Sequence, residues 1–173
     1  EIVPWKEAKV HVLTHGLHYG SSVFEGERAY DGVIFKTTEH SIRFRKSAEI
    51  MDFEIPFSVE ELNAAKDKVV ALNGGGDQYV RPVAWRGSEM MAVAAQHAKI
   101  HVAIAVWDWP SMFDIATKMK GIKLDIADYR RPDPQCAPVH GATPATPRAS
   151  RRTMSRSPGR PLPPPQVQPA ARR

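Results

Sequence analysis

The sequence predicts a small α+β (α/β) domain with a mixed β-sheet and two helices, followed by a disordered tail. Three observations predict this fold class. In the first and last parts of residues 1–128, apolar and polar residues alternate with the period of a strand. In the middle part, the apolar residues recur with the period of a helix. No such period is present after residue 138, where proline and arginine predominate. The element order β-β-β-α-α-β-β-β favours mixed strand directions over a doubly wound parallel sheet.

Three strands are expected before the first helix. Apolar valines alternate with polar residues in KVHVLTHG (9–16), which predicts the first strand. The segment SVFEGERAYDGVIFKT (22–37) predicts two further strands joined by a turn at Asp31-Gly32. This dipeptide suits a two-residue hairpin turn, because both central residues of such a turn need positive φ angles.

The middle of the chain predicts two helices. Thr38 is the expected N-cap of EHSIRFRKSAEIMDF (39–53). The residues expected on the inward face of this helix are Ile42, Ala48 and Met51. In the second helix Ser58 and Glu61 form a capping box, and the glycines of NGGGD (73–77) end it. Its periodic apolar residues are Leu62, Ala65, Val69 and Leu72.

Strands are expected again after the helices. The segments QYVRPVAWRG (78–87) and KIHVAIAVWDW (99–109) are rich in β-branched and aromatic residues, and the second is apolar enough for a central strand. GIKLDIADY (121–129) alternates with the strand period. Tyr79 and Arg81 alternate within the first of these segments, so we expect both side chains on the same face of the sheet.

The tail has a composition of its own. All 19 acidic residues and every lysine precede Ala137, whereas the last 37 residues contain 7 arginines and 9 prolines. Residues 1–136 therefore carry a net charge of −2, and the formal net charge of +5 comes from the tail. Proline excludes regular helix and central strand there, so we expect disorder. A basic tail without aromatic residues attracts anions generically, and no nucleic-acid partner is expected.

Several other function classes are disfavoured. His11, His15 and His18 have the spacing of metal ligands on a helix, but they lie in a segment predicted as strand and turn, so no metal site is expected. No apolar run reaches the roughly 18 to 20 residues of a membrane span, and no basic-then-apolar leader pattern is present. Together with the single cysteine, Cys136, these observations favour a cytoplasmic protein without a membrane partner.

Three arginines are candidates for an anion site. Arg28, Arg43 and Arg81 each lie in a structurally constrained segment, and a fixed guanidinium binds carboxylate or phosphate through two parallel hydrogen bonds. Trp107 and Trp109 lie at the end of a predicted strand, where the pattern is equally compatible with core packing and with a pocket wall.

Three motifs occur in order along the chain: HGLHYGSSVFEGERAY (15–30), EHSIRFRKSA (39–48) and YVRPVAWRG (79–87). In this order and spacing they resemble the fold-type IV pyridoxal-phosphate-dependent aminotransferases, and within them the branched-chain amino acid aminotransferases. The resemblance covers Ile2 to Pro138. It implies the small N-terminal domain of that fold, pyridoxal 5'-phosphate as cofactor, and transfer of an amino group between leucine, isoleucine or valine and 2-oxoglutarate. The implied partners are branched-chain amino acids, glutamate and 2-oxo acids, and the implied assembly is a homo-oligomer.

The resemblance implies a substrate pocket that combines aromatic walls with one arginine. Arg81 would meet the distal carboxylate of glutamate, and Tyr79 would approach the α-carboxylate. Tyr19 and Phe24 would line the space for an apolar side chain. The implied substrate-binding residues are Tyr19, Phe24, Tyr79, Arg81 and Trp109.

The resemblance also places the cofactor. Arg43, in the motif EH..R, would bind the phosphate of pyridoxal phosphate, and Gly26 and Arg28 of the motif FEG.R would support the site. The family's catalytic residue is a Schiff-base lysine that lies shortly after the segment YRRPDPQCAP (129–138), but no lysine follows Lys123 in this sequence. We therefore expect no catalytic residue, and no transaminase activity, in these 173 residues.

The predicted organisation is a small N-terminal domain at 1–128, an interdomain linker at 129–138 and a Pro/Arg-rich tail at 139–173, with the large second domain of the family absent. We hypothesise that the tail is a frame-shifted translation, because the composition switches abruptly inside a recognisable motif. Two alternatives stay open. One is a sister enzyme of the same fold type, either a D-amino acid aminotransferase or an aminodeoxychorismate lyase, and the other is a non-catalytic half-domain that acts by binding.

Overall fold

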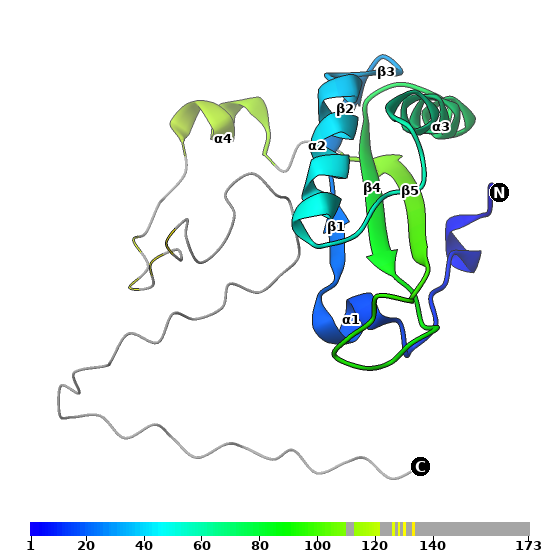
Figure 1. The fold of residues 1–173 in the computed structure, drawn as a ribbon. Helices are drawn as coiled ribbons and strands as arrows, with labels where there is room; N and C mark the ends of the chain where they lie inside the picture. The colour runs from blue at the N-terminus through cyan, green and yellow to red at the C-terminus, as the bar shows by residue number, and fades with distance from the viewer. Residues whose placement is uncertain (110–112, 122–125, 127, 129, 131–132, 134–173) are drawn as a thin grey trace, which may run out of the picture.

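The computed structural model describes residues 1–109, 113–121, 126, 128, 130 and 133. Its centre is an antiparallel sheet covered on one face by two helices (Figure 1), which confirms the α+β class. The strands are β1 (Ser22–Phe24), β2 (Glu27–Tyr30), β3 (Val33–Ile34), β4 (Gln78–Arg86) and β5 (Ile100–Asp108). The helices are α1 (His15–Tyr19), α2 (Thr37–Ile50), α3 (Val59–Leu72) and α4 (Ile115–Lys120), and a 3-10 turn, η1, spans Trp5–Glu7.

Strand β4 is the centre of the sheet. Along one edge it pairs with β5 over its whole length. Along the other edge β1 and β2 follow one another in a continuous register, which places Phe24 opposite Val83 and Glu27 opposite Val80. All pairings between the described strands are antiparallel, whereas the sequence favoured mixed directions. The segment expected to be central, 99–109, pairs with β4 alone among these strands, so it lies at an edge of the described sheet.

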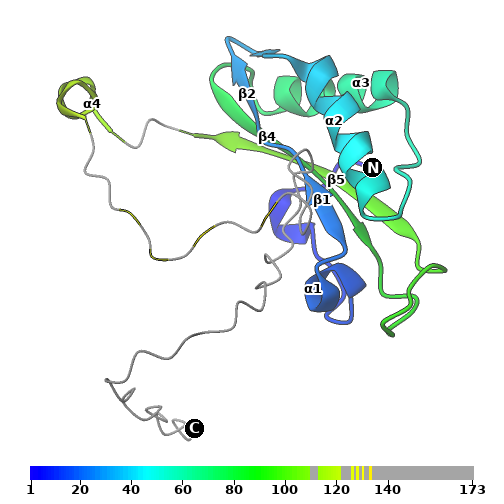
Figure 2. The same cartoon turned by 60° about the vertical axis from the view of Figure 1, so that its left-hand side comes forward.

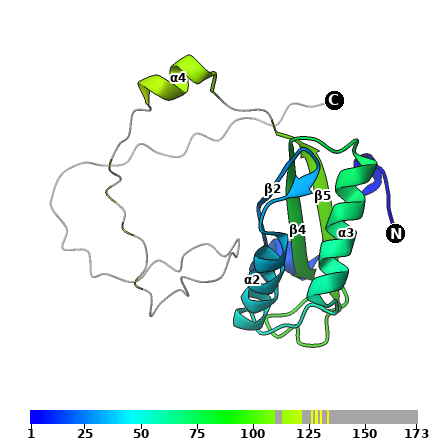
Figure 3. The same ribbon diagram turned by 90° about the horizontal axis from the view of Figure 1, so that it is seen from above.

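Helices α2 and α3 lie side by side on one face of the sheet (Figures 2 and 3). α2 contacts β1, and α3 contacts β4 and β5. Two apolar clusters fill the space between helices and strands. The first contains Val23, Phe44, Ala48, Phe53, Ile55, Leu62 and Ala84. The second contains Ala29, Ile34, Val70 and Val80.

The turns and the second helix follow the local sequence signals. Asp31 and Gly32 have φ angles of 49° and 81°, and they join β2 to β3 as the predicted two-residue hairpin turn. The capping box is confirmed: the Glu61 amide donates to the Ser58 hydroxyl at 3.1 Å, and the Ser58 amide donates to the Glu61 carboxylate at 2.8 Å. α3 ends at Leu72, before three glycines that all have positive φ.

The strand predicted at 9–16 is wrong. No strand begins before Ser22, and His15 instead starts the short helix α1, which Gly20 ends with a φ of 67°. The cause is tertiary. His15 is buried, its amide donates to the carbonyl of Gly87, and its ring is hydrogen-bonded to Ser21 and to the carbonyl of Ala92. These bonds hold the segment against the end of β4 rather than along a strand edge.

The start and the inward face of α2 also differ from the prediction. The helix begins at Thr37 after Lys36, whose φ of 56° is left-handed, and Thr38 is not the N-cap. The hydroxyl of Thr38 instead accepts a hydrogen bond from Asn63 on α3 at 3.0 Å. Ile42 is 56% exposed and not inward-facing. Ala48 is buried and Met51 packs on the first cluster, as predicted. The remaining buried residues of α2 are Ser41, Phe44 and Ser47.

The buried face of α3 agrees with the prediction at its first apolar position and differs from it further along the helix. Leu62 is buried as expected, but Ala65 and Leu72 are exposed, and the other buried residues are Lys66 and Val70. The sequence pattern failed because a lysine occupies the middle of the buried stripe, where only an ion pair can compensate its charge.

The predictions for the C-terminal part fall largely on positions that the structure does not describe. The strand predicted at 121–129, the linker at 129–138 and the tail at 139–173 lie outside the described residues, apart from 121, 126, 128, 130 and 133. Within the described part of the chain, no helix combines the length and the apolar character that a membrane crossing requires.

Candidate active site

The candidate active site begins with the two faces of β4. Alternate residues of this strand are buried beneath the helices, and those between them, including Tyr79 and Arg81, are partly exposed on the opposite face. The shared face predicted for Tyr79 and Arg81 is therefore confirmed. The antiparallel register places Trp107 opposite Tyr79 and Arg28 opposite Tyr79 on the other edge. We call this surface the open face; it is formed by Phe24, Arg28, Tyr79, Arg81, Trp107 and Trp109.

Three aromatic rings form one end of the open face. The ring of Tyr79 lies 4.9 Å, between centroids, from each of Trp107 and Trp109, and the two tryptophans are 5.8 Å apart. The tryptophans remain 37% and 39% exposed, so they line a surface rather than fill the core. Aromatic rings at this spacing attract one another, and the exposed part of the two tryptophans adds apolar ring surface to the open face.

Arg81 is the cation of the open face. Its Nη2 donates to the Tyr79 hydroxyl at 2.8 Å, and its guanidinium carbon lies 4.3 Å from the centre of the Phe24 ring. Its Nε is buried without a hydrogen-bond partner, and no acid forms an ion pair with it among the described residues. A buried N–H group without an acceptor is costly, so this guanidinium is suited to an anionic ligand such as a carboxylate.

Gly26 is required by the position of Tyr79. A Cβ atom built at Gly26 would lie 2.2 Å from the Tyr79 hydroxyl oxygen. The glycine therefore serves close approach rather than an unusual backbone angle, because its φ is not positive. The strand edge and the tyrosine hydroxyl can meet only if no side chain is present at this position.

Replacing Gly26 by alanine is expected to displace the Tyr79 hydroxyl and to lower the free energy of unfolding by about 1–3 kcal/mol, the usual cost of overpacking. The shift should change the near-ultraviolet circular dichroism of the Tyr79 and tryptophan rings. Tyr79→Phe removes the nearest atom, so Gly26→Ala should cost clearly less in that background. Equal costs in the two backgrounds would show that the Tyr79 hydroxyl is not what restricts this position.

Arg28 holds the end of β5. Its Nη1 donates to the backbone carbonyl of Trp109 at 3.0 Å, and its guanidinium lies 5.7 Å from the ring centre of Tyr30. The bond joins β2 to a residue that follows β5, across the width of β4. This bond holds the backbone of Trp109 beside the open face, and the supporting role expected of Arg28 stays a prediction.

Tyr19 lies apart from these contacts. It ends α1, is 50% exposed, and stacks on the ring of His15 with a centroid distance of 4.5 Å. Within the described residues, no ring contact or hydrogen bond joins Tyr19 to the open face. Its predicted place beside Phe24 in a side-chain pocket stays a prediction.

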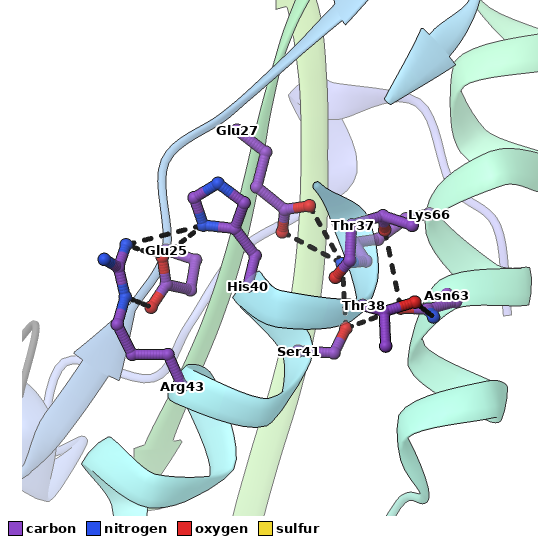
Figure 4. A network of polar contacts seen from close by, with 9 residues as sticks. All are labelled: Glu25, Glu27, Thr37, Thr38, His40, Ser41, Arg43, Asn63 and Lys66. Atoms are coloured by element: carbon purple, nitrogen blue, oxygen red, sulfur yellow. Dashed lines mark hydrogen bonds and ion pairs between the residues drawn. The ribbon is translucent and has the colours of Figure 1, made fainter. Parts of the chain in front are cut away.

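Arg43 lies on α2 and is bound by an acid. Its Nε and Nη2 donate to the two carboxylate oxygens of Glu25 at 2.7 and 2.6 Å (Figure 4). His40, one turn earlier on the helix, lies 2.8 Å from the same carboxylate through Nδ1. The Glu25 side chain is fully buried, whereas that of Arg43 is 53% exposed. Arg43 therefore offers Nη1, which has no partner among the described residues, as its free donor for an anion.

The pKa of Glu25 reflects these partners. Burial alone would raise it, but the hydrogen bonds from Arg43 and His40, together with their charges, lower the pKa of this carboxyl below its ordinary value. Glu25 is thus a carboxylate at neutral pH, and the reciprocal effect raises the pKa of Arg43 further above its ordinary value.

Because folding lowers the pKa of Glu25, its ion pair should stabilise the fold at pH values above 4.5, the ordinary pKa of this group. The stabilisation should be lost as the pH falls through the lowered pKa of the folded state. Urea denaturation between pH 6 and the acid limit of folding measures this loss, which we expect to be smaller in Glu25→Gln. Glu54→Gln, on a side chain that is 84% exposed, is the control. Parallel stability curves for wild type and Glu25→Gln would contradict the expectation.

A second acid on the same strand edge is paired inside the protein. Lys66 on α3 and Glu27 on β2 are almost completely buried, and Nζ donates to the two carboxylate oxygens at 3.0 and 2.9 Å (Figure 4). Nζ also donates to the carbonyl of Thr37 at 3.1 Å and to the hydroxyl of Ser41 at 2.8 Å. Burial raises the pKa of Glu27, and the lysine opposes this effect. The pair joins the sheet, α3 and the first turn of α2.

The sequence did not indicate Glu25, Glu27, His40 or Lys66. For Lys66 and its acidic partner the sequence did contain a signal. Lys66 lies four residues from both Leu62 and Val70 in an apolar stripe, and a buried lysine requires a buried acid. No group of three or more potential metal ligands is present among the described residues. A hollow of about 440 Å³ lies at the end of α2, lined in part by Arg45, Glu49 and Phe53 and by none of the open-face residues.

Comparisons with known proteins identify the family of this chain. The profile of the family "Amino-transferase class IV" matches residues 22–143. A probable branched-chain-amino-acid aminotransferase of Rickettsia conorii is 39% identical over 146 residues, which are 84% of this chain and 49% of the relative. The branched-chain-amino-acid aminotransferase of Pseudomonas aeruginosa is 42% identical over 135 residues, 76% of this chain and 44% of the relative. The chain thus spans about half the length of these curated relatives.

Solved structures show the same similarity. The branched-chain amino acid aminotransferase of T.th. with pyridoxamine 5'-phosphate has a TM-score of 0.76 and 38% identity, covering 82% of this chain and 48% of that one. The T.th. protein was also solved with 4-methylvaleric acid and with N-(5'-phosphopyridoxyl)-L-glutamate; there the TM-score is 0.59 and the identity 46%, over 62% of this chain and 38% of that one. The chain belongs to the class IV aminotransferase family, and within it resembles the N-terminal region of the branched-chain-amino-acid aminotransferases.

Proposed function

We propose that this sequence forms the N-terminal part of a pyridoxal-phosphate-dependent enzyme that transfers an amino group between leucine, isoleucine or valine and 2-oxoglutarate. The observation that carries the proposal is Arg81: its buried Nε lacks an acceptor among the described residues, and the rings of Phe24 and Tyr79 flank its guanidinium. The family resemblance further suggests a homo-oligomer that acts in the cytoplasm.

The open face meets the chemical demand of such a reaction. One pocket must accept an apolar side chain in one half-reaction and the carboxylate of glutamate in the other. Phe24, Trp107 and Trp109 present apolar ring surface, and Arg81 provides a charge that Tyr79 and the Phe24 ring already hold in place. The T.th. relative was solved with both an apolar acid and a glutamate derivative, which supports this interpretation.

The residues near α2 fit the phosphate of the cofactor. Arg43 retains its Nη1 and half its side-chain surface for a ligand, while Glu25 holds the rest of the guanidinium. A phosphate dianion accepts hydrogen bonds from such a fixed donor. When bound, pyridoxal phosphate supplies the electron sink for bond cleavage at the amino-acid α-carbon. Tyr79 and Arg81 would orient the substrate carboxylates, and the two tryptophans would exclude water from the apolar side.

The residues 1–173 alone are expected to lack transaminase activity, because no lysine follows Lys123 to form the Schiff base and move the proton. A chimera tests the proposal: residues 1–138 joined to the part of the Pseudomonas aeruginosa relative that this chain does not cover. We expect the chimera to convert leucine, isoleucine and valine with 2-oxoglutarate. The unmodified 173-residue chain, assayed in parallel, should show no product above background.

The substrate panel also separates the alternatives. Turnover of D-alanine in place of leucine, or release of pyruvate from aminodeoxychorismate, would favour a sister enzyme of the same fold type. A soluble chimera that binds pyridoxal phosphate but converts none of these substrates would contradict the proposed activity and favour a binding role. Conversely, a borohydride-reducible cofactor adduct on a lysine of the 173-residue chain would contradict the expected inactivity.

A further inference from the structure

We propose that Glu25 is a positioning residue that fixes the guanidinium of Arg43 and sets its place relative to the Tyr79–Arg81 pair. The importance of this for catalysis rests on the proposed function, in which Arg43 binds the cofactor phosphate. The positioning itself is a property of the described residues and can be measured without cofactor.

The first support is the path of the chain at residues 24–26. β1 and β2 form one interrupted strand along β4, and Glu25 lies in the interruption with its amide bonded to the Pro82 carbonyl at 3.0 Å. Phe24 faces Arg81 on the open face, and Gly26 lies against the Tyr79 hydroxyl. Glu25, between them, faces α2 instead. Three consecutive residues therefore contact the two arginines and the tyrosine.

The second support is the geometry of the ion pair. Arg43 has a long side chain on an exposed part of α2, and without a partner it would sample many rotamers. Nε and Nη2 bind different oxygens of one carboxylate, an arrangement that fixes the plane of the guanidinium as well as its position. The carboxylate is itself fixed, because its side chain is fully buried and His40 binds one of its oxygens.

The third support is the direction that remains free. Since the carboxylate occupies the Nε–Nη2 edge, Nη1 is the nitrogen left without a partner among the described residues. Glu25 also offsets the positive charge of Arg43, so it would weaken any general attraction of anions. An acid that reduces attraction but defines direction is expected where a ligand must bind in one orientation.

The experiment is nitrogen-15 NMR of the arginine side chains in residues 1–173. In wild type we expect an Arg43 Nε–H signal that is protected from exchange with water. In Glu25→Gln this exchange should be about tenfold faster or more, because the charge-assisted hydrogen bond is lost. Glu25→Asp should restore part of the protection. Glu89→Gln, which breaks the exposed Glu89–His101 pair elsewhere, is the matched control and should leave Arg43 unchanged.

Amide spectra of each variant report whether the fold is kept; if Glu25→Gln does not fold, Glu25→Asp takes its place in the comparison. Unchanged Arg43 exchange in a folded Glu25 variant would overturn the positioning. The proposed function is tested separately in the chimera, by the ratio of dissociation constants for pyridoxal and pyridoxal phosphate. If Arg43→Met leaves this ratio unchanged, Arg43 does not bind the phosphate, whatever the NMR comparison shows about Glu25.

Discussion

Replacing Lys66 by methionine is expected to lower the free energy of unfolding by about 3–5 kcal/mol, because it leaves the buried carboxylate of Glu27 without its partner. Both side chains are almost fully buried, so water cannot replace the lost bonds. The substitution also removes a donor from the Ser41 hydroxyl and from the Thr37 carbonyl at the start of α2. Urea denaturation of residues 1–173, followed by circular dichroism, measures the change.

Two further variants separate the ion pair from the general effect of losing a lysine. Lys68→Met, on the exposed side of the same helix, should change the free energy of unfolding by no more than about 0.5 kcal/mol. Combining Lys66→Met with Glu27→Leu removes both charges, and it should be less destabilising than Lys66→Met alone. A loss below about 1 kcal/mol for Lys66→Met would show that the pair contributes little to stability.

Replacing Arg81 by methionine in the chimera is expected to lower the ratio of kcat/KM for glutamate to that for leucine about tenfold or more, since a hydrogen bond to a charged group contributes roughly 1.5–3 kcal/mol. The distal carboxylate of glutamate would lose its cation, whereas the leucine side chain has no such requirement. Methionine preserves much of the volume beside Phe24, so the aromatic wall should be retained.

For Arg81→Met, the kcat/KM for leucine is the internal reference for the kcat/KM for glutamate. Arg45→Met, on α2 and away from the open face, should leave the ratio unchanged. Equal losses for glutamate and leucine would mean that Arg81 acts on a group common to both substrates, such as the α-carboxylate that Tyr79 is proposed to approach. That outcome would contradict the role in binding the distal carboxylate.

Local chemistry made several elements predictable. The Asp31-Gly32 turn, the Ser58–Glu61 capping box and the glycines after Leu72 each depend on interactions within a few residues. The same holds for the shared face of Tyr79 and Arg81, which follows from the two-residue period of a strand. The face of the sheet that carries the candidate site could therefore be named in advance.

Other predictions failed where distant residues decided the outcome. The segment 9–16 alternates like a strand, yet the bonds of His15 to Ser21, Gly87 and Ala92 hold its end as a helical turn. Ile42 was expected inside because it is apolar, but Ser41 is buried in its place, since it binds Lys66. Hydrophobic periodicity cannot identify a buried polar residue whose partner lies elsewhere in the sequence.

The amino-acid sequence was sufficient for the fold class, the order of most elements, the family resemblance and the shared face of Tyr79 and Arg81, because these depend on local period and on motifs. Only the tertiary structure shows the partners of three charged residues. Arg43 is held by Glu25, Lys66 is paired with Glu27, and Arg28 binds the carbonyl of Trp109. These partners lie 18, 39 and 81 residues apart, and no local pattern encodes such distances. They arise because the pairing of β4 with both its neighbours, and the packing of two helices on one face, bring separate segments together.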